Sequence, residues 1–117
     1  MLRYFWDVVV ALDPEAKELD EKVRFPIYQP EALEATFTGA GLKVQEVRAL
    51  EAATVFENFD DYWQPFLGGV GPAPRYVGAL SAERRTELAS ILREVLPIQP
   101  DGSIPLSARA WAVKAFV

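Results

Sequence analysis

The C-terminal stretch of the chain constrains the fold more than any other, because residues 107–117 predict a strand that is apolar on both faces. One face would carry Trp111, Val113, Ala115 and Val117, and the other Ala108, Ala110, Ala112 and Phe116. Only Arg109 and Lys114 interrupt this pattern. Such a pattern is typical of an interior strand rather than an edge strand, yet the sequence predicts only one other strand beside it.

Length and composition indicate a single domain over residues 1–117. The chain is 50% hydrophobic and 25% charged, as in an ordinary globular domain, and it is long enough to bury a core. Its formal net charge is −5, and the sequence contains no run of Lys or Arg that would attract nucleic-acid phosphates. We therefore expect no nucleic acid among its partners.

The chain has neither cysteine nor histidine, which narrows its chemistry. Thiol nucleophiles, imidazole bases and the usual zinc or iron ligands are excluded, so we expect no metal site. The apolar run at residues 8–12 is too short to span a bilayer and lacks the flanks of a signal peptide. The sequence therefore predicts no membrane association and a cytoplasmic location.

Hydrophobic periodicity predicts four to five helices. They are expected over residues 2–12, 13–22, 30–41 and 81–97, with a further helix in the aromatic segment described below. The helix at 2–12 has a wide apolar and aromatic face. Ser81 is the expected N-cap of the last helix, and Pro14 the first residue of the second one.

Two strands complete the expected fold, at residues 42–50 and 107–117. The alternation of the first strand changes phase between Val44 and Val47, which indicates a bulge near Gln45 or a strand covered on both faces. Residues 24–28 are expected to be extended, because prolines restrict the residues that precede them. The pattern as a whole predicts an α+β fold with few strands.

An aromatic segment at residues 56–76, FENFDDYWQPFLGGVGPAPRY, raises the question of a site. The ring-bearing candidates in it are Phe59, Tyr62, Trp63, Phe66 and Tyr76. The first four share one helix face, at positions i, i+3, i+4 and i+7. They could cap a small-molecule pocket, form a subunit interface, or pack as an ordinary core.

The polar residues of this segment are expected to serve the fold. Asn58 or Asp60 should cap the helix, in preference to an acid/base role for Asp60 and Asp61. The glycine turn at residues 68–71 is expected to be a plain loop, because Pro72 and Pro74 remove donors that an anion site would need. No catalytic residue is therefore predicted.

Four stretches resemble the C-terminal portion of class I S-adenosylmethionine-dependent methyltransferases. They are YFWDVVVALDP, LDEKVRFPIYQPEALEATFTGAGL, FENFDDYWQPFLGGVGPAP and DGSIPLSARAWAVKAF. The resemblance implies the last strands of that fold, in a few-stranded antiparallel sheet packed with cap helices. It also implies that the cofactor-binding half is absent, so no cofactor residue carries over. S-adenosylmethionine would bind only with a complementary half.

The same resemblance places the strand at 107–117 between two neighbours, one of which would be missing. An apolar edge left unpaired in this way recruits another strand, so we expect a homodimer. The interface candidates are Trp6, Arg109, Trp111 and Val113. Arg109 is a charge in an apolar strand whose burial would need a partner, and we expect Asp or Glu as that partner rather than a ligand.

Three functions follow as hypotheses. The first is a methyltransferase-derived module, non-catalytic alone and dimeric, that binds an apolar small molecule or is the remnant product of a truncated or mobile gene. The second is the acceptor-binding part of a split methyltransferase, and the third is a protein–protein interaction module.

Overall fold

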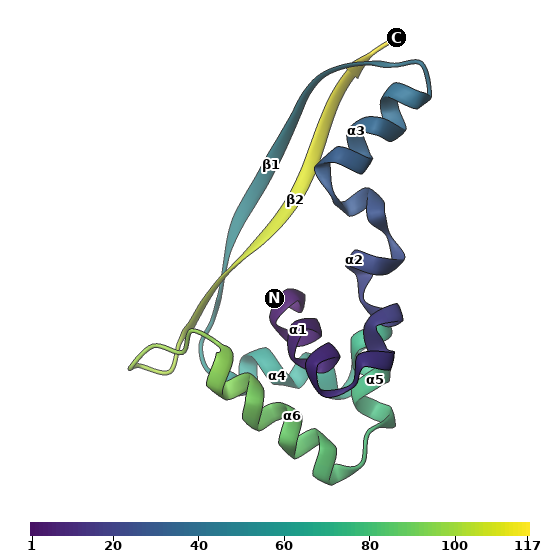
Figure 1. Cartoon of the computed structure of the whole chain (residues 1–117). Helices are drawn as coiled ribbons and strands as arrows, with labels where there is room; N and C mark the ends of the chain where they lie inside the picture. The colour runs from purple at the N-terminus through teal and green to yellow at the C-terminus, as the bar shows by residue number, and fades with distance from the viewer.

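The computed structural model describes residues 1–117. The chain folds into a helical body and a long β-ribbon (Figure 1). The elements in chain order are α1 (Leu2–Leu12), the 3₁₀ helix η1 (Pro14–Leu19), α2 (Glu21–Arg24), the 3₁₀ helix η2 (Pro26–Tyr28), α3 (Pro30–Gly39), β1 (Lys43–Phe56), α4 (Phe59–Gly68), α5 (Pro72–Ala79), α6 (Ala82–Val95) and β2 (Ile104–Phe116). The fold is α+β with a two-stranded antiparallel sheet, as the sequence predicts.

The core lies in the helical body, where α1, α4, α5 and α6 pack together (Figure 1). It contains Phe5, Trp6, Val8 and Val9 from α1, four rings from α4, Ala73 and Val77 from α5, and Leu88 and Leu92 from α6. Ile104 and Leu106 at the start of β2 are also buried. These two residues anchor the ribbon in the body.

The ribbon joins β1 to β2 along their whole length. The register runs from Lys43 opposite Phe116 to Phe56 opposite Ile104, and it shifts between Val44 and Glu46. The shift is a β-bulge, which confirms the bulge predicted near Gln45. The strands differ from expectation in length, because β1 continues to Phe56 instead of ending at Leu50.

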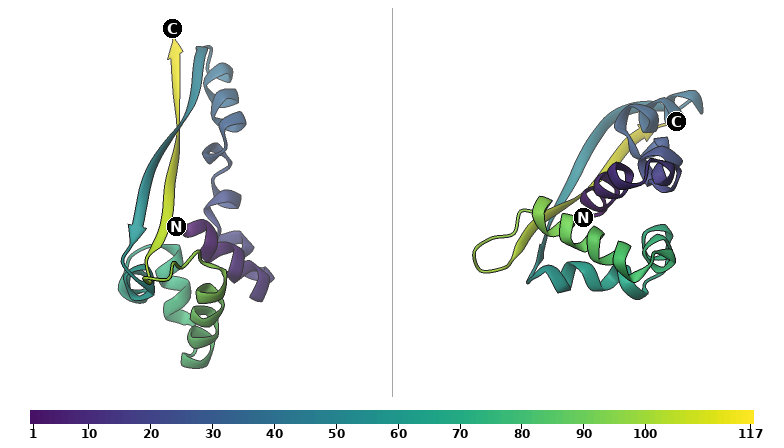
Figure 2. Two further views of the ribbon diagram at one scale, coloured as in Figure 1. Left: turned by 90° about the vertical axis from the view of Figure 1, so that its left-hand side faces the viewer. Right: turned by 60° about the horizontal axis from the view of Figure 1, so that its bottom comes forward.

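The ribbon leaves the body and has little covering. In Figure 2 it extends away from the body formed by α1, α4, α5 and α6, with α3 beside its distal part, and α3 contacts both strands. The side chains of Leu50, Val55 and Phe116 are 53%, 61% and 52% exposed. The prediction of an interior strand is therefore wrong, because β2 pairs with β1 alone and its other edge is unpaired.

The open ribbon gives the molecule an unusual surface. Its radius of gyration is 17.1 Å, whereas a compact domain of this length would have about 13 Å. Its accessible surface is 7762 Å², which exceeds by about 1,400 Å² the area expected for a compact monomer of 13.1 kDa. The excess measures the surface that the fold leaves uncovered.

Two segments differ locally from expectation. Residues 26–28 form the 3₁₀ helix η2 instead of an extended segment, because Pro26 holds only Phe25 out of the helical region while its own fixed φ suits a first helical position. The glycine turn is followed at once by α5, with Pro72 at its first position. The six α-helices consequently exceed the four to five expected.

Candidate functional site

The start of α4 is fixed by two reciprocal side-chain caps. The Asn58 side chain accepts a hydrogen bond from the Asp61 amide at 2.9 Å, and Asp61 Oδ2 accepts one from the Glu57 amide at 3.0 Å. This confirms Asn58 as the cap and gives Asp61 a structural role. Asp60 is exposed, 4.0 Å from Arg93 Nη2.

The four rings of α4 pack against one another and against α1. Phe59, Tyr62, Trp63 and Phe66 are each 8% exposed or less. Phe66 stacks on Phe5 with ring centroids 4.6 Å apart, and lies 5.3 Å from Tyr62 and 5.8 Å from Trp63. The outer side of Phe59 is covered by the Arg93 guanidinium at 4.0 Å. All four rings belong to the hydrophobic core cluster of the helical body.

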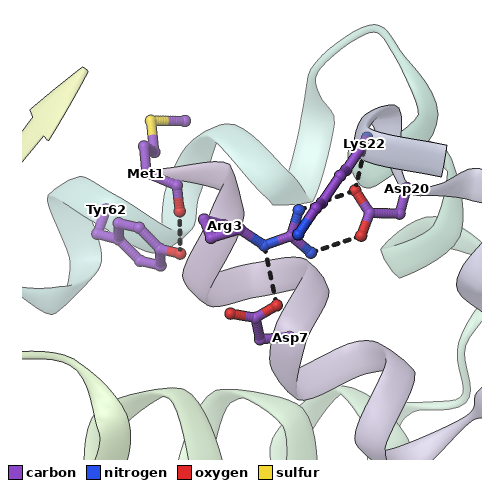
Figure 3. Close-up of polar contacts among 6 residues, drawn as sticks. All are labelled: Met1, Arg3, Asp7, Asp20, Lys22 and Tyr62. Carbon is purple, nitrogen blue, oxygen red and sulfur yellow. Dashed lines mark hydrogen bonds and ion pairs between the residues drawn. The ribbon is translucent and has the colours of Figure 1, made fainter. Parts of the chain in front are cut away.

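The two candidate tyrosines hold their protons at neutral pH. Burial, helped by Tyr4, raises the pKa of Tyr62, whose hydroxyl donates to the Met1 carbonyl at 3.1 Å (Figure 3). Burial and the Asp13 carboxylate raise the pKa of Tyr76, whose hydroxyl donates to Asp13 Oδ2 at 3.1 Å. Neither phenol is tuned to act as a base near neutral pH.

Tyr76 lies apart from the α4 helix face. Its ring is 6.5 Å from that of Phe5 and 6.3 Å from that of Trp6. It borders a cavity of about 60 Å³ lined also by Val9, Asp13 and Leu88. Ligand pockets span about 300–1,000 Å³, so this cavity is too small for a drug-sized ligand.

A larger apolar groove lies between α1 and α6, where no site residue is predicted from the sequence. Its volume is about 450 Å³, and its lining residues are Tyr4, Asp7, Val8, Ala11, Leu12, Ile91 and Val95. The sequence feature that indicates this groove is the wide apolar face of the helix at 2–12, because one neighbouring helix cannot cover so broad a face.

The interface candidates fall into two groups. Trp6 is 0% exposed in the core and its Nε1 has no hydrogen-bond partner, so it offers no surface to another subunit. Trp111 and Val113 are half-buried on the ribbon. Arg109 pairs with Glu51 on β1, with Nε 2.7 Å from Oε1, which confirms the acidic partner. The pair lies at the surface, since the two side chains are 57% and 49% exposed.

A salt bridge that the sequence did not predict ties α1 to the start of α2 (Figure 3). Arg3 donates to both carboxylate oxygens of Asp20, with Nη1 3.1 Å from Oδ1, and also to Asp7. Asp20 accepts in addition from the Lys22 amide at 3.0 Å. Burial by itself raises the pKa of Asp20, but these hydrogen bonds and charges outweigh it and the pKa is lowered.

No cluster of His, Cys, Asp or Glu in the structure is arranged to hold a metal ion. No helix combines the length and the apolar character needed to cross a membrane. No family model, curated protein or solved structure matches the chain.

Proposed function

We propose that the chain is a non-catalytic assembly module whose β-ribbon is covered by a second polypeptide in a complex. The observation that carries this proposal is the ribbon itself, with exposed apolar side chains, an unpaired outer edge on each strand and an excess of about 1,400 Å² of surface over a compact monomer. The origin suggested for such a module, the C-terminal portion of a class I methyltransferase, rests on the sequence resemblance alone.

The physical reason is that the chain itself covers only part of the ribbon. A two-stranded ribbon needs further strands or a packed helix to be stable in water, and here α3 contacts both strands while Leu50 and Val55 stay more than half exposed. Stable protein interfaces bury about 800 Å² on each partner. The uncovered surface of this chain is therefore large enough to supply a full interface.

The polar groups of the aromatic segment support a non-catalytic role. Asn58 and Asp61 are engaged in capping α4, and the Tyr62 hydroxyl binds the Met1 carbonyl. None of the three is left to face a substrate. Two partners fit the proposal: a second copy of the chain, and the separate cofactor-binding chain of a split methyltransferase.

The test combines small-angle scattering with amide hydrogen exchange of the purified chain. We expect either a complex larger than the 13.1 kDa chain, or an extended monomer with a radius of gyration near 17.1 Å and rapidly exchanging ribbon amides. A compact monomer with a radius of gyration of about 13 Å and protected ribbon amides would contradict the proposal, because the chain would then cover its own ribbon.

A second candidate function is the binding of an apolar small molecule, which the groove between α1 and α6 favours. The probe is 1-anilinonaphthalene-8-sulfonate, whose fluorescence rises in apolar sites. Ala11→Arg should fill the groove and abolish the rise, whereas Ala35→Arg on the exposed side of α3 should preserve it. Equal binding by both variants would refute this site.

A further inference from the structure

We propose that the second polypeptide is a second copy of this chain, joined through the unpaired edge of β2. The product is a four-stranded antiparallel sheet in the order β1-β2-β2-β1. This inference rests on the proposed function and adds to it the partner, the strand edge and the register.

Charge distinguishes the two edges of the ribbon. β1 carries Lys43, Glu46, Arg48 and Glu51, whereas β2 carries only Arg109 and Lys114. Charged side chains on an edge strand oppose pairing with another chain. The edge of β2 is therefore the less charged one, and its only proline, Pro105, lies near the end of the strand where it removes a single donor.

The uncovered area fits a pair of identical chains. Each copy has an excess of about 1,400 Å² of surface over a compact monomer, which is more than the roughly 800 Å² that each partner contributes to a standard interface. A two-fold axis makes the same strand edge serve on both copies, so both free β2 edges are paired in one step.

Symmetry and charge then select the register. A two-fold axis perpendicular to the sheet keeps the faces of the two strands aligned, so odd positions pair with odd and even with even. A register centred on Arg109 or on Lys114 would place like charges directly opposite each other, which is destabilising. Both of these registers are excluded.

A register centred on Ala110 is the one that pairs β2 over its whole length, Ile104–Phe116. It places Arg109 opposite Trp111 of the second copy, twice by symmetry, and Ala108 opposite Ala112. A guanidinium over an exposed indole contributes about 0.5–1 kcal/mol. Arg109 and Trp111 already lie on one face in the single chain, with the guanidinium 5.7 Å from the ring.

The cysteine-free sequence allows a direct test by single introduced thiols. Residues opposite each other in an antiparallel pair have Cα atoms about 4.5–5.5 Å apart, within the range of about 4.4–6.8 Å that a disulfide spans. Ala110→Cys should therefore form a covalent dimer under mild oxidation. Ala112→Cys should not, because its two copies lie four residues apart along the strand.

Ala52→Cys is the matched control for the edge. Ala52 lies on β1 directly opposite Ala108, on the same face as Ala110, and all three are exposed. We expect at least about a tenfold greater fraction of covalent dimer for Ala110→Cys than for either control. Sedimentation of the unmodified chain should independently give twice the mass of 13.1 kDa.

The outcomes separate this inference from the proposed function. Crosslinking of Ala52→Cys instead would overturn the choice of edge, and crosslinking of Ala112→Cys instead would overturn the register. An extended monomer with unprotected ribbon amides would overturn the homodimer and leave the assembly module standing. A compact monomer with protected amides would overturn both.

Discussion

Truncation of Phe66 distinguishes a packed aromatic core from a lid over a pocket. The side chain is 1% exposed and stacks on Phe5 at 4.6 Å. Burying a phenylalanine contributes about 1.5–3 kcal/mol, and a favourable aromatic pair adds about 0.5–1.5 kcal/mol. We therefore expect Phe66→Ala to lower the free energy of unfolding by about 3–4 kcal/mol, within the usual range for buried rings.

The assay is urea denaturation followed by tryptophan fluorescence at one fixed protein concentration. The midpoint should fall with the slope unchanged, and the melting temperature should fall by about 12–16 °C at roughly 4 °C per kcal/mol. Phe25→Ala is the matched control, because Phe25 is 41% exposed and lies outside the core cluster, beside Tyr28 and Arg24. It should cost less than about 1 kcal/mol.

A loss at Phe66 as small as the loss at Phe25 would refute the packed core. It would mean that the α4 rings cover an empty or solvent-filled space, as a lid does, and that truncation leaves little new cavity behind.

Three other outcomes are expected. Acid should destabilise the chain through Asp20, because the pKa of Asp20 is lower in the folded chain than its ordinary value of 3.8. The ionised carboxylate therefore stabilises the fold above pH 3.8, and this contribution is lost as the pH falls through the lowered pKa. Asp20→Asn should flatten this part of the pH dependence of unfolding. Asn58→Ala should lower the free energy of unfolding by about 1 kcal/mol, and Asn58→Ser should restore most of it; equal losses would rule out the cap. S-adenosylmethionine should leave the melting temperature unchanged, whereas a saturable rise would reveal a cofactor site in the chain.

Local signals were enough to predict much of the secondary structure. The helix at Leu2–Leu12 depends on nearby residues only. The same holds for the cap of α6, where the Ser81 hydroxyl accepts a hydrogen bond from the Arg84 amide. The bulge near Gln45 follows from a change of phase within one strand. Each of these features is set within a few residues along the chain.

Features that depend on distant partners were not predictable in the same way. β1 continues past Leu50 because residues 51–56 meet the first half of β2 in register, and no local pattern specifies that pairing. The salt bridge between Arg3 and Asp20 likewise requires η1 to bring α2 back to α1.

For the candidate site, the sequence predicts which side chains share a helix face but not what that face contacts. The i, i+3, i+4 spacing correctly placed the α4 rings on one face, but whether that face meets a ligand, a subunit or the core is decided by what packs on it. Phe5 occupies that position. Trp6 was assigned to an interface because aromatic residues on an amphipathic helix look alike whether a partner or the same chain covers them.

The placement of β1 and β2 has a consequence for the order of folding. All of α4, α5 and α6 lies between them in the chain, so the strands are partners of high sequence separation and their pairing is entropically expensive until the helices have formed. Ile104 and Leu106 are buried in that helical core and would bring β2 to the end of β1 at Phe56. The ribbon should then close from the body toward its tip. During synthesis β1 stays unpaired until β2 has emerged, and the charges along β1 then limit its pairing with other chains through that interval.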